Sequence, residues 1–133
     1  AFSLGFQRSF GELKDWTISG EMFYNSAGQP DESDYAALLL AGQFTPLYLG
    51  QWYAYAGLTK QNLFADFLDA TLSGFLNASD LSYAVKLAAT FDLPRFIPFT
   101  VSLGYNGGGA DKEFTWFSGD NAVNASLQFR FEF

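Results

Sequence analysis

Six charged residues alternate with apolar neighbours in this chain, and their spacing suggests a shared chemical role. They are Glu21, Asp69, Lys86, Asp92, Arg130 and Glu132. Alternate side chains of a strand point to opposite faces, so these charges would share a face with Ser, Thr, Asn and Gln. Such a face could line a pore and set its preference for ions. Alternatively, the charges pair across neighbouring strands and fill a narrow interior.

Acid–base and metal chemistry have few candidate groups. The chain has no His and no Cys, which removes the commonest catalytic base, the commonest metal ligand and any thiolate or disulfide site. Asp66 and Asp69 could form a carboxylate pair, but nothing positions a substrate beside them. Further carboxylates stand between the apolar segments: Asp31, Glu32, Asp34, Asp111, Glu113 and Asp120. The EF-hand pattern is absent, so we expect solvated loop charge, no metal, no cofactor and no enzyme.

The composition departs from that of a soluble domain. Hydrophobic residues make up 49% of the 133 residues, aromatic residues 20% and charged residues only 16%, where a soluble domain has about a quarter charged. The longest apolar run, Tyr35 to Gly42, is far shorter than the ~20 residues of a membrane-spanning helix. The net charge of −7 argues against nucleic acid as a partner.

Period-two alternation disperses the apolar residues along strands. It is clearest at the end of the chain, where Val123, Ala125, Leu127, Phe129, Phe131 and Phe133 alternate with Asn124, Ser126, Gln128, Arg130 and Glu132. Six further segments are predicted as strands: Phe2 to Phe10, Trp16 to Asn25, Gln51 to Lys60, Leu68 to Asn77, Leu81 to Leu93 and Ile97 to Tyr105. Most have about 10 residues, the length of a tilted transmembrane strand. The apolar set would then face lipid and the polar set a lumen. A soluble barrel would reverse the faces, and the few charged residues argue against it.

One segment favours a helix. Tyr35 to Gly42 is rich in Ala and Leu, Asp31 can cap its start, and Gly42 can end it. We expect a short helix within a long outer loop, Ser26 to Gly50. The competing interpretation is an eighth strand, Asp34 to Phe44, in a closed eight-stranded barrel.

The connections support a barrel with two unlike ends. Ser26 to Gly50 and Gly107 to Asn121 are long and fall on one side, which is expected of the outer loops of such barrels. Closed single-chain bacterial barrels have an even number of strands, so seven strands predict that residues 1–133 form one barrel domain or segment, the C-terminal part of a larger barrel. Four aromatic residues near strand ends, Trp16, Trp52, Tyr24 and Tyr105, would form interface girdles.

The last seven residues, Leu-Gln-Phe-Arg-Phe-Glu-Phe, carry a family resemblance. They resemble the terminal strand of Gram-negative outer-membrane β-barrel proteins of the porin-like kind. The resemblance implies that Phe129, Phe131 and Phe133 are an assembly signal read by the barrel-assembly machinery. It also implies localisation to the bacterial outer membrane, with the lipid bilayer, lipopolysaccharide and further protein subunits as partners.

Two functions follow as hypotheses. The first is a channel for diffusion of small polar solutes through a charged lumen. The alternative is a non-conducting scaffold that docks a partner protein through its outer loops. The position of the helix distinguishes them. Folded into the lumen, it would narrow or gate a pore. Outside, with Leu38 and Leu39 exposed, it would imply a partner protein or lipid.

Overall fold

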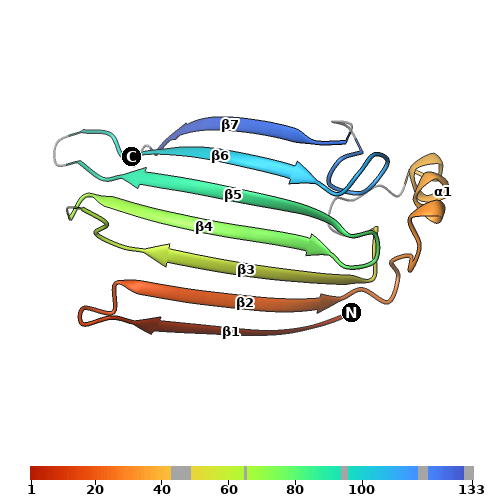
Figure 1. The fold of residues 1–133 in the computed structure, drawn as a ribbon, viewed down its shortest axis with the longest axis horizontal. Helices are drawn as coiled ribbons and strands as arrows, with labels where there is room; N and C mark the ends of the chain where they lie inside the picture. Colours follow the sequence, from red (N-terminus) through yellow and green to blue (C-terminus); the bar gives the residue numbers. More distant parts are fainter. Residues whose placement is uncertain (43–48, 65, 94–95, 117–119, 131–133) are drawn as a thin grey trace.

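The chain folds into one antiparallel sheet. The computed structural model describes residues 1–42, 49–64, 66–93, 96–116 and 120–130. Its strands are β1 (Phe2–Phe10), β2 (Trp16–Tyr24), β3 (Trp52–Lys60), β4 (Leu68–Asn77), β5 (Ser82–Phe91), β6 (Phe99–Gly107) and β7 (Ala122–Phe129). Each strand pairs with the next in sequence, so the sheet is an up-and-down meander (Figure 1).

The seven strands lie where the alternation predicts them, with shifts at some ends. β6 begins at Phe99 rather than Ile97, because Pro98 has no N–H to donate to a ladder. β5 begins after Leu81, whose φ of 60° is not that of a strand. The all-β, antiparallel prediction is confirmed.

The register keeps the two sets of side chains on opposite faces across the whole sheet. Phe6, Gly20, Ala56, Gly74 and Val85 follow one another as cross-strand partners, all on what we call the apolar face. The opposite, polar face carries mostly Ser, Thr, Asn and Gln. Within the described strands, only Arg8 and Lys60 place a charge on the apolar face.

The sheet is not closed into a barrel. Among the described residues, β1 and β7 each pair with a single neighbour, so both present an open edge. Because every neighbouring pair is antiparallel and both strands have odd numbers, β1 and β7 run in the same direction. Joining these two edges directly would therefore create a parallel pair, unlike every other pair in the sheet.

A short helix is present where the sequence predicts one. The 3-10 turn η1 (Glu32–Asp34) leads into α1 (Tyr35–Leu40), beyond the ends of the strands (Figure 1). The backbone N–H of Ser33 donates to Asp31 Oδ1 at 2.9 Å, and hydrogen bonds from the Ser33 backbone and hydroxyl lower the pKa of Asp31. Gly42, with φ of 69°, follows the helix in the left-handed conformation. The alternative strand from Asp34 to Phe44 is wrong over residues 34–40, while residues 43 and 44 lie outside the described residues.

The connections make the two ends of the sheet unlike. Residues 11–15, 61–67 and 92–98 join strands at what we call the turn end, and residues 25–51, 78–81 and 108–121 join them at the loop end. Both long connections share the loop end, as predicted. Nothing among the described helical residues is long and apolar enough to cross a membrane as a helix.

Candidate functional site

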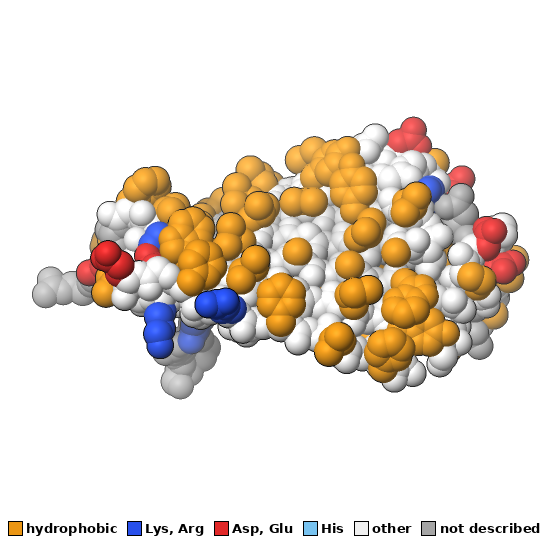
Figure 2. Space-filling model, turned by 60° about the horizontal axis from the view of Figure 1, so that its bottom comes forward, with side chains coloured by type: hydrophobic (Ala, Val, Ile, Leu, Met, Phe, Trp, Pro, Cys, Tyr) orange, Lys and Arg blue, Asp and Glu red, His pale blue; other side chains and the backbone are white. Residues whose placement is uncertain are grey.

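The apolar face is largely uncovered. Leu4, Phe6 and Val123 are 75%, 62% and 77% exposed. Figure 2 shows groups of hydrophobic side chains over much of one side of the molecule, with other side chains or backbone between them. An exposed apolar surface that extends over seven strands marks a binding surface for a protein, a membrane or a ligand.

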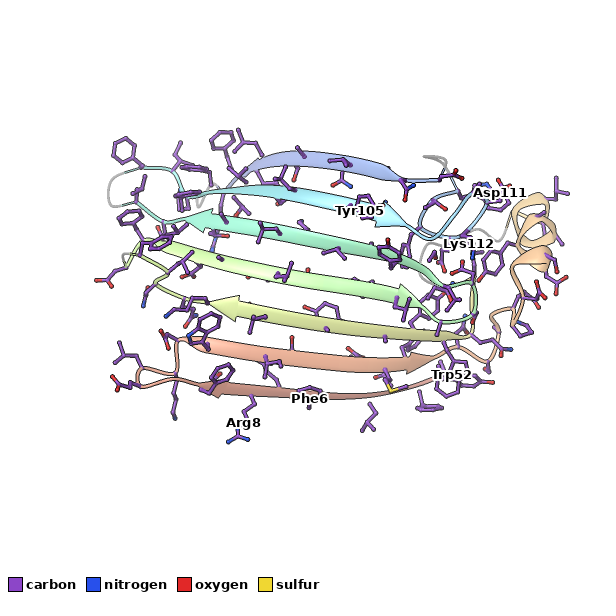
Figure 3. The ribbon with its side chains drawn as sticks, in the orientation of Figure 1. Phe6, Arg8, Trp52, Tyr105, Asp111 and Lys112 are labelled. Atoms are coloured by element: carbon purple, nitrogen blue, oxygen red, sulfur yellow. The ribbon has the colours of Figure 1, made fainter. Side chains whose placement is uncertain are left out.

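Aromatic side chains gather at both ends of this face. At the loop end, the ring centroids of Tyr24 and Trp52 lie 4.7 Å apart, with Phe2 5.5 Å from Tyr24. Tyr105 lies three strands further on, on β6, with its centroid 6.0 Å from that of Tyr83, and Figure 3 shows Trp52 and Tyr105 toward the same end of the sheet.

The turn end carries a matching group. Phe10 stacks on Trp16 with centroids 6.2 Å apart, and Phe91 stacks on Phe99 at 4.8 Å. Eight residue steps separate Phe2 from Phe10, about 27 Å along the strand at ~3.4 Å per residue. All four predicted interface aromatics therefore lie on the apolar face toward strand ends.

The predicted pore charges are dispersed rather than paired with one another. Glu21 lies opposite Gly5 and Tyr55, Asp69 opposite Thr90, and Lys86 opposite Ser73 and Gly104. All three are on the polar face, and none is a cross-strand partner of another. Asp69 also accepts the backbone N–H of Asn62 at 3.0 Å, so it helps hold a turn.

The remaining predicted charges lie just beyond strands or outside the described residues. Asp92 follows β5 and donates its backbone N–H to the carbonyl of Phe67 at 2.9 Å, while Arg130 follows β7 and donates its own to the carbonyl of Pro98 at 2.9 Å. Glu132, Phe131 and Phe133 lie outside the described residues. Phe129 ends β7, its centroid 6.3 Å from that of Phe99.

Hydroxyl pairs fill much of the polar face between these charges. Oxygen–oxygen distances of 2.7 to 3.1 Å join Ser9 to Thr17, Thr59 to Thr71, Thr90 to Thr100, and Ser102 to Ser126. Such pairs stabilise neighbouring strands and satisfy hydroxyl groups that lack other partners. The polar face is therefore hydrophilic without being densely charged.

The polar face also carries aromatic side chains, which the alternation of polar and apolar residues did not predict there. The centroids of Tyr55 and Phe75 lie 4.8 Å apart, and those of Phe23 and Tyr53 lie 6.0 Å apart. The available signal was the break in alternation, because Phe23 and Phe75 occupy positions where the pattern calls for polar residues. These rings cover part of β2, β3 and β4.

A buried network of hydrogen bonds connects the segments at the loop end. The Tyr53 hydroxyl donates to Glu113 Oε2 at 2.7 Å, and Asn77 Nδ2 donates to the same oxygen at 2.9 Å. Asn77 Nδ2 also lies 3.0 Å from the Tyr35 hydroxyl, and the Gly50 N–H donates to the Tyr53 hydroxyl at 2.7 Å. We call Tyr35, Tyr53, Asn77, Asp80 and Glu113 the loop-end cluster.

Asp80 connects the cluster by hydrogen bonds to the last long connection, residues 108–121. Its Oδ1 accepts the Ser82 N–H at 2.7 Å and its Oδ2 accepts the Glu113 N–H at 2.9 Å. The Lys112 ammonium donates to the Asp80 carbonyl. Burial, then the negative charge of Asp80 and of Glu113, raises the pKa of Tyr35 above its usual value. The phenol therefore keeps its proton to a higher pH than an ordinary tyrosine does.

The expectation of solvated loop charge is wrong for Glu113. Its side chain is only 5% exposed, because Tyr53 and Asn77 supply donors that replace water. Within the described parts of the chain, no group of three or more acidic residues is placed to hold a metal ion. The cluster holds three connections in place.

Comparison of the chain with protein-family models, with curated proteins and with solved structures finds no match. The features that bear on function are therefore the two faces and two ends of the sheet.

Proposed function

We propose that this chain forms part of the wall of a transmembrane β-barrel in a bacterial outer membrane. The supporting observation is the apolar face, uncovered across seven strands and bounded at both ends by aromatic side chains. Outer-membrane barrels have an apolar outer band about 25 Å tall between two aromatic girdles, with polar residues inside. Strands of nine or ten residues predominate here and have the required length.

Further strands complete this barrel. An exposed edge in the hydrocarbon region would leave backbone N–H and C=O groups without partners, at several kcal/mol each. Since β1 and β7 run in the same direction, antiparallel closure requires an odd number of additional strands. The total is then even, as in single-chain bacterial barrels.

The barrel encloses the polar face, and its function is diffusion of small polar solutes through a lumen lined by hydroxyls, amides, Glu21, Asp69 and Lys86. The proposed partners are the bilayer, lipopolysaccharide, the assembly machinery that reads Phe129, Phe131 and Phe133, and further protein subunits.

Depth-dependent quenching tests the membrane proposal. Chains with a single Trp at position 16 or 52 are placed in vesicles whose lipids carry bromine at a shallow or a deep position of the acyl chain. Shallow bromine should quench both, and deep bromine should quench Leu87→Trp, midway along β5 on the apolar face. Tyr55→Trp, on the polar face, is the control and should be quenched least. A chain that remains soluble and unquenched at all four positions would refute the proposal.

One observation favours the scaffold as a second candidate. Leu40 in α1 is 91% exposed, while Tyr35 at the start of the same helix is fully buried. The helix is thus anchored at the loop end yet presents an apolar side chain outward, as a docking surface would. Steady single-channel conductance of the reconstituted protein supports the channel, and a silent bilayer in all conditions supports the scaffold.

A further inference from the structure

We propose that the apolar face holds one anionic glycerophospholipid, with its phosphate at Arg8 and an acyl chain in a groove across β1 to β5. The inference depends on the proposed membrane function and adds a specific lipid site to it.

The groove is a feature of the middle of the apolar face. It has a volume of about 830 Å³ and its walls include Phe6, Ile18, Met22, Leu58 and Val85. Its floor is low at Ala56 and Gly74, cross-strand neighbours that place little or no side chain there, while the Phe6 ring lies over Gly20 at the β1 side. Sites for small ligands typically have volumes of about 300–1,000 Å³ and apolar walls.

Arg8 supplies a cation at one border of this groove. It lies on β1 two residues from Phe6 and opposite Ile18, both of which line the groove. Figure 3 shows its side chain extending away from the strands. Among the described residues, no carboxylate lies within salt-bridge distance of Arg8. Lys60, the other cation of the apolar face, is already paired with Asp15 and lies 5.5 Å from the Trp16 ring centroid.

The charge and position of Arg8 indicate the occupant. A guanidinium binds phosphate through paired N–H donors. Arg8 lies near the turn end, two residues before Phe10 of the Phe10–Trp16 aromatic pair. At this depth the lipid head groups meet the acyl chains. A phospholipid satisfies both features at once, since its phosphate reaches Arg8 while its chain covers the groove. If the Arg8 side chain only extended into water, apolar groups alone would line the groove. The groove would then not select one lipid head group over another.

Selective quenching tests this site. Single-Trp16 and single-Trp52 chains are placed in phosphatidylcholine vesicles containing brominated phosphatidylglycerol or brominated phosphatidylcholine. Trp16, two residues along β2 from the partner of Arg8, should prefer phosphatidylglycerol by about three- to five-fold, the effect of one cation near an anionic lipid. Trp52, which lies on β3 at the opposite, loop end of the sheet, should show no preference.

Variants separate the two parts of the site. Arg8→Gln and Gly74→Val should each abolish the preference at Trp16. A Cβ at Gly74 would meet no atom closer than 3.7 Å, so the first carbon of the new side chain has room on the floor of the groove. Lys14→Gln, in the adjoining turn, and Ala125→Val, on the apolar face of β7, are the matched controls and should retain the preference.

The outcomes remain distinguishable from failure of the membrane proposal. If no brominated lipid quenches either Trp, the membrane proposal fails. If both are quenched but Trp16 shows no preference, or Lys14→Gln removes it as fully as Arg8→Gln, the lipid site is wrong. Loss of the preference in Arg8→Gln but not in Gly74→Val would overturn the role of the groove.

Discussion

The hydroxyl of Tyr53 lies 2.7 Å from Oε2 of Glu113, a residue 60 positions further along the chain. The contact joins a strand to the last long connection. Asn77 donates to the same oxygen, so one carboxylate accepts hydrogen bonds from the ends of two strands. The loop end is therefore held by a few buried polar contacts, whereas the sheet is held by backbone ladders.

Removing that carboxylate should loosen the loop end. We expect Glu113→Ala to lower the free energy of unfolding by about 3 kcal/mol, because it leaves the Tyr53 hydroxyl and the Asn77 amide buried without their acceptor. Chemical unfolding in lipid or detergent gives the energy, and hydrogen exchange should rise in residues 25–51 and 108–121. Glu113→Gln retains an acceptor oxygen and should cost less. Glu12→Ala, exposed in a turn, should stay within about 0.5 kcal/mol of the unchanged chain, and an equally small change in Glu113→Ala would contradict the role of the network.

Alkaline pH should weaken the folded state through Tyr35. Its pKa is raised in the folded state, mainly by burial and then by Asp80, so the folded chain holds this proton more tightly than the unfolded chain. The contribution is fully present below pH 10, near the usual Tyr pKa, and is lost as the pH rises above it. The slope should approach about 1.4 kcal/mol per pH unit.

Tyr35→Phe provides the comparison for that slope. It removes the ionisable group, so the difference in unfolding free energy between the two chains should shrink as the pH rises from 9 to 11. The other six Tyr residues are present in both chains, so the comparison isolates Tyr35 together with its effect on the neighbouring Tyr53. A difference that stays constant with pH would show that the Tyr35 pKa is not raised.

The sequence predicted the strands because each one repeats a two-residue pattern that depends only on its own residues. Val123 to Phe129 and Leu68 to Asn77 are examples. The helix was predictable from local signals as well, since Asp31 and Gly42 bracket it. Even the polar-face positions of Glu21, Asp69 and Lys86 followed from alternation alone.

The loop-end cluster was not predictable in the same way. Asn77 and Glu113 are 36 residues apart and meet only through the strand register and the path of two connections. Glu113 by itself looks like any acidic loop residue, and nothing near it in sequence reveals its donors. Whether the first and last strands pair was equally hidden, because the alternation determines which way side chains face but not which strand edges meet.

Two glycines of the apolar face should respond oppositely to an added methyl group. A Cβ on Gly20 would lie 2.6 Å from Cε1 of Phe6, whereas a Cβ on Gly74 would have only ordinary contacts, 3.7 Å and beyond. We expect Gly20→Ala to cost about 1 kcal/mol of unfolding free energy, because the Phe6 ring must move. Gly74→Ala should gain about 0.5 kcal/mol by restricting the unfolded chain.

A double-variant cycle isolates the cause. If the Phe6 ring is what opposes the methyl group, the cost of Gly20→Ala should vanish in a Phe6→Ala background, a non-additive result. Chemical unfolding measures all four chains. Equal costs in both backgrounds would show that the ring does not determine the effect.

Charge reversal on the polar face should change ion selectivity if that face lines a pore. Lys86 lies on β5 opposite Ser73 and Gly104, and its neighbours on the same face of that strand are Ala84 and Ala88, so its ammonium has room to extend into the lumen. In a KCl gradient, Lys86→Glu should move the reversal potential toward the cation value. Glu21→Lys should move it toward the anion value. The shifts should be large at 0.01 M salt and small at 1 M, where the Debye length falls from about 30 Å to about 3 Å. Lys14→Glu makes the same charge change in the turn between β1 and β2 and should have little effect, because that residue lies outside the lumen. Conductance that persists with the same reversal potential in Lys86→Glu and Glu21→Lys would place the ion path elsewhere than along this face.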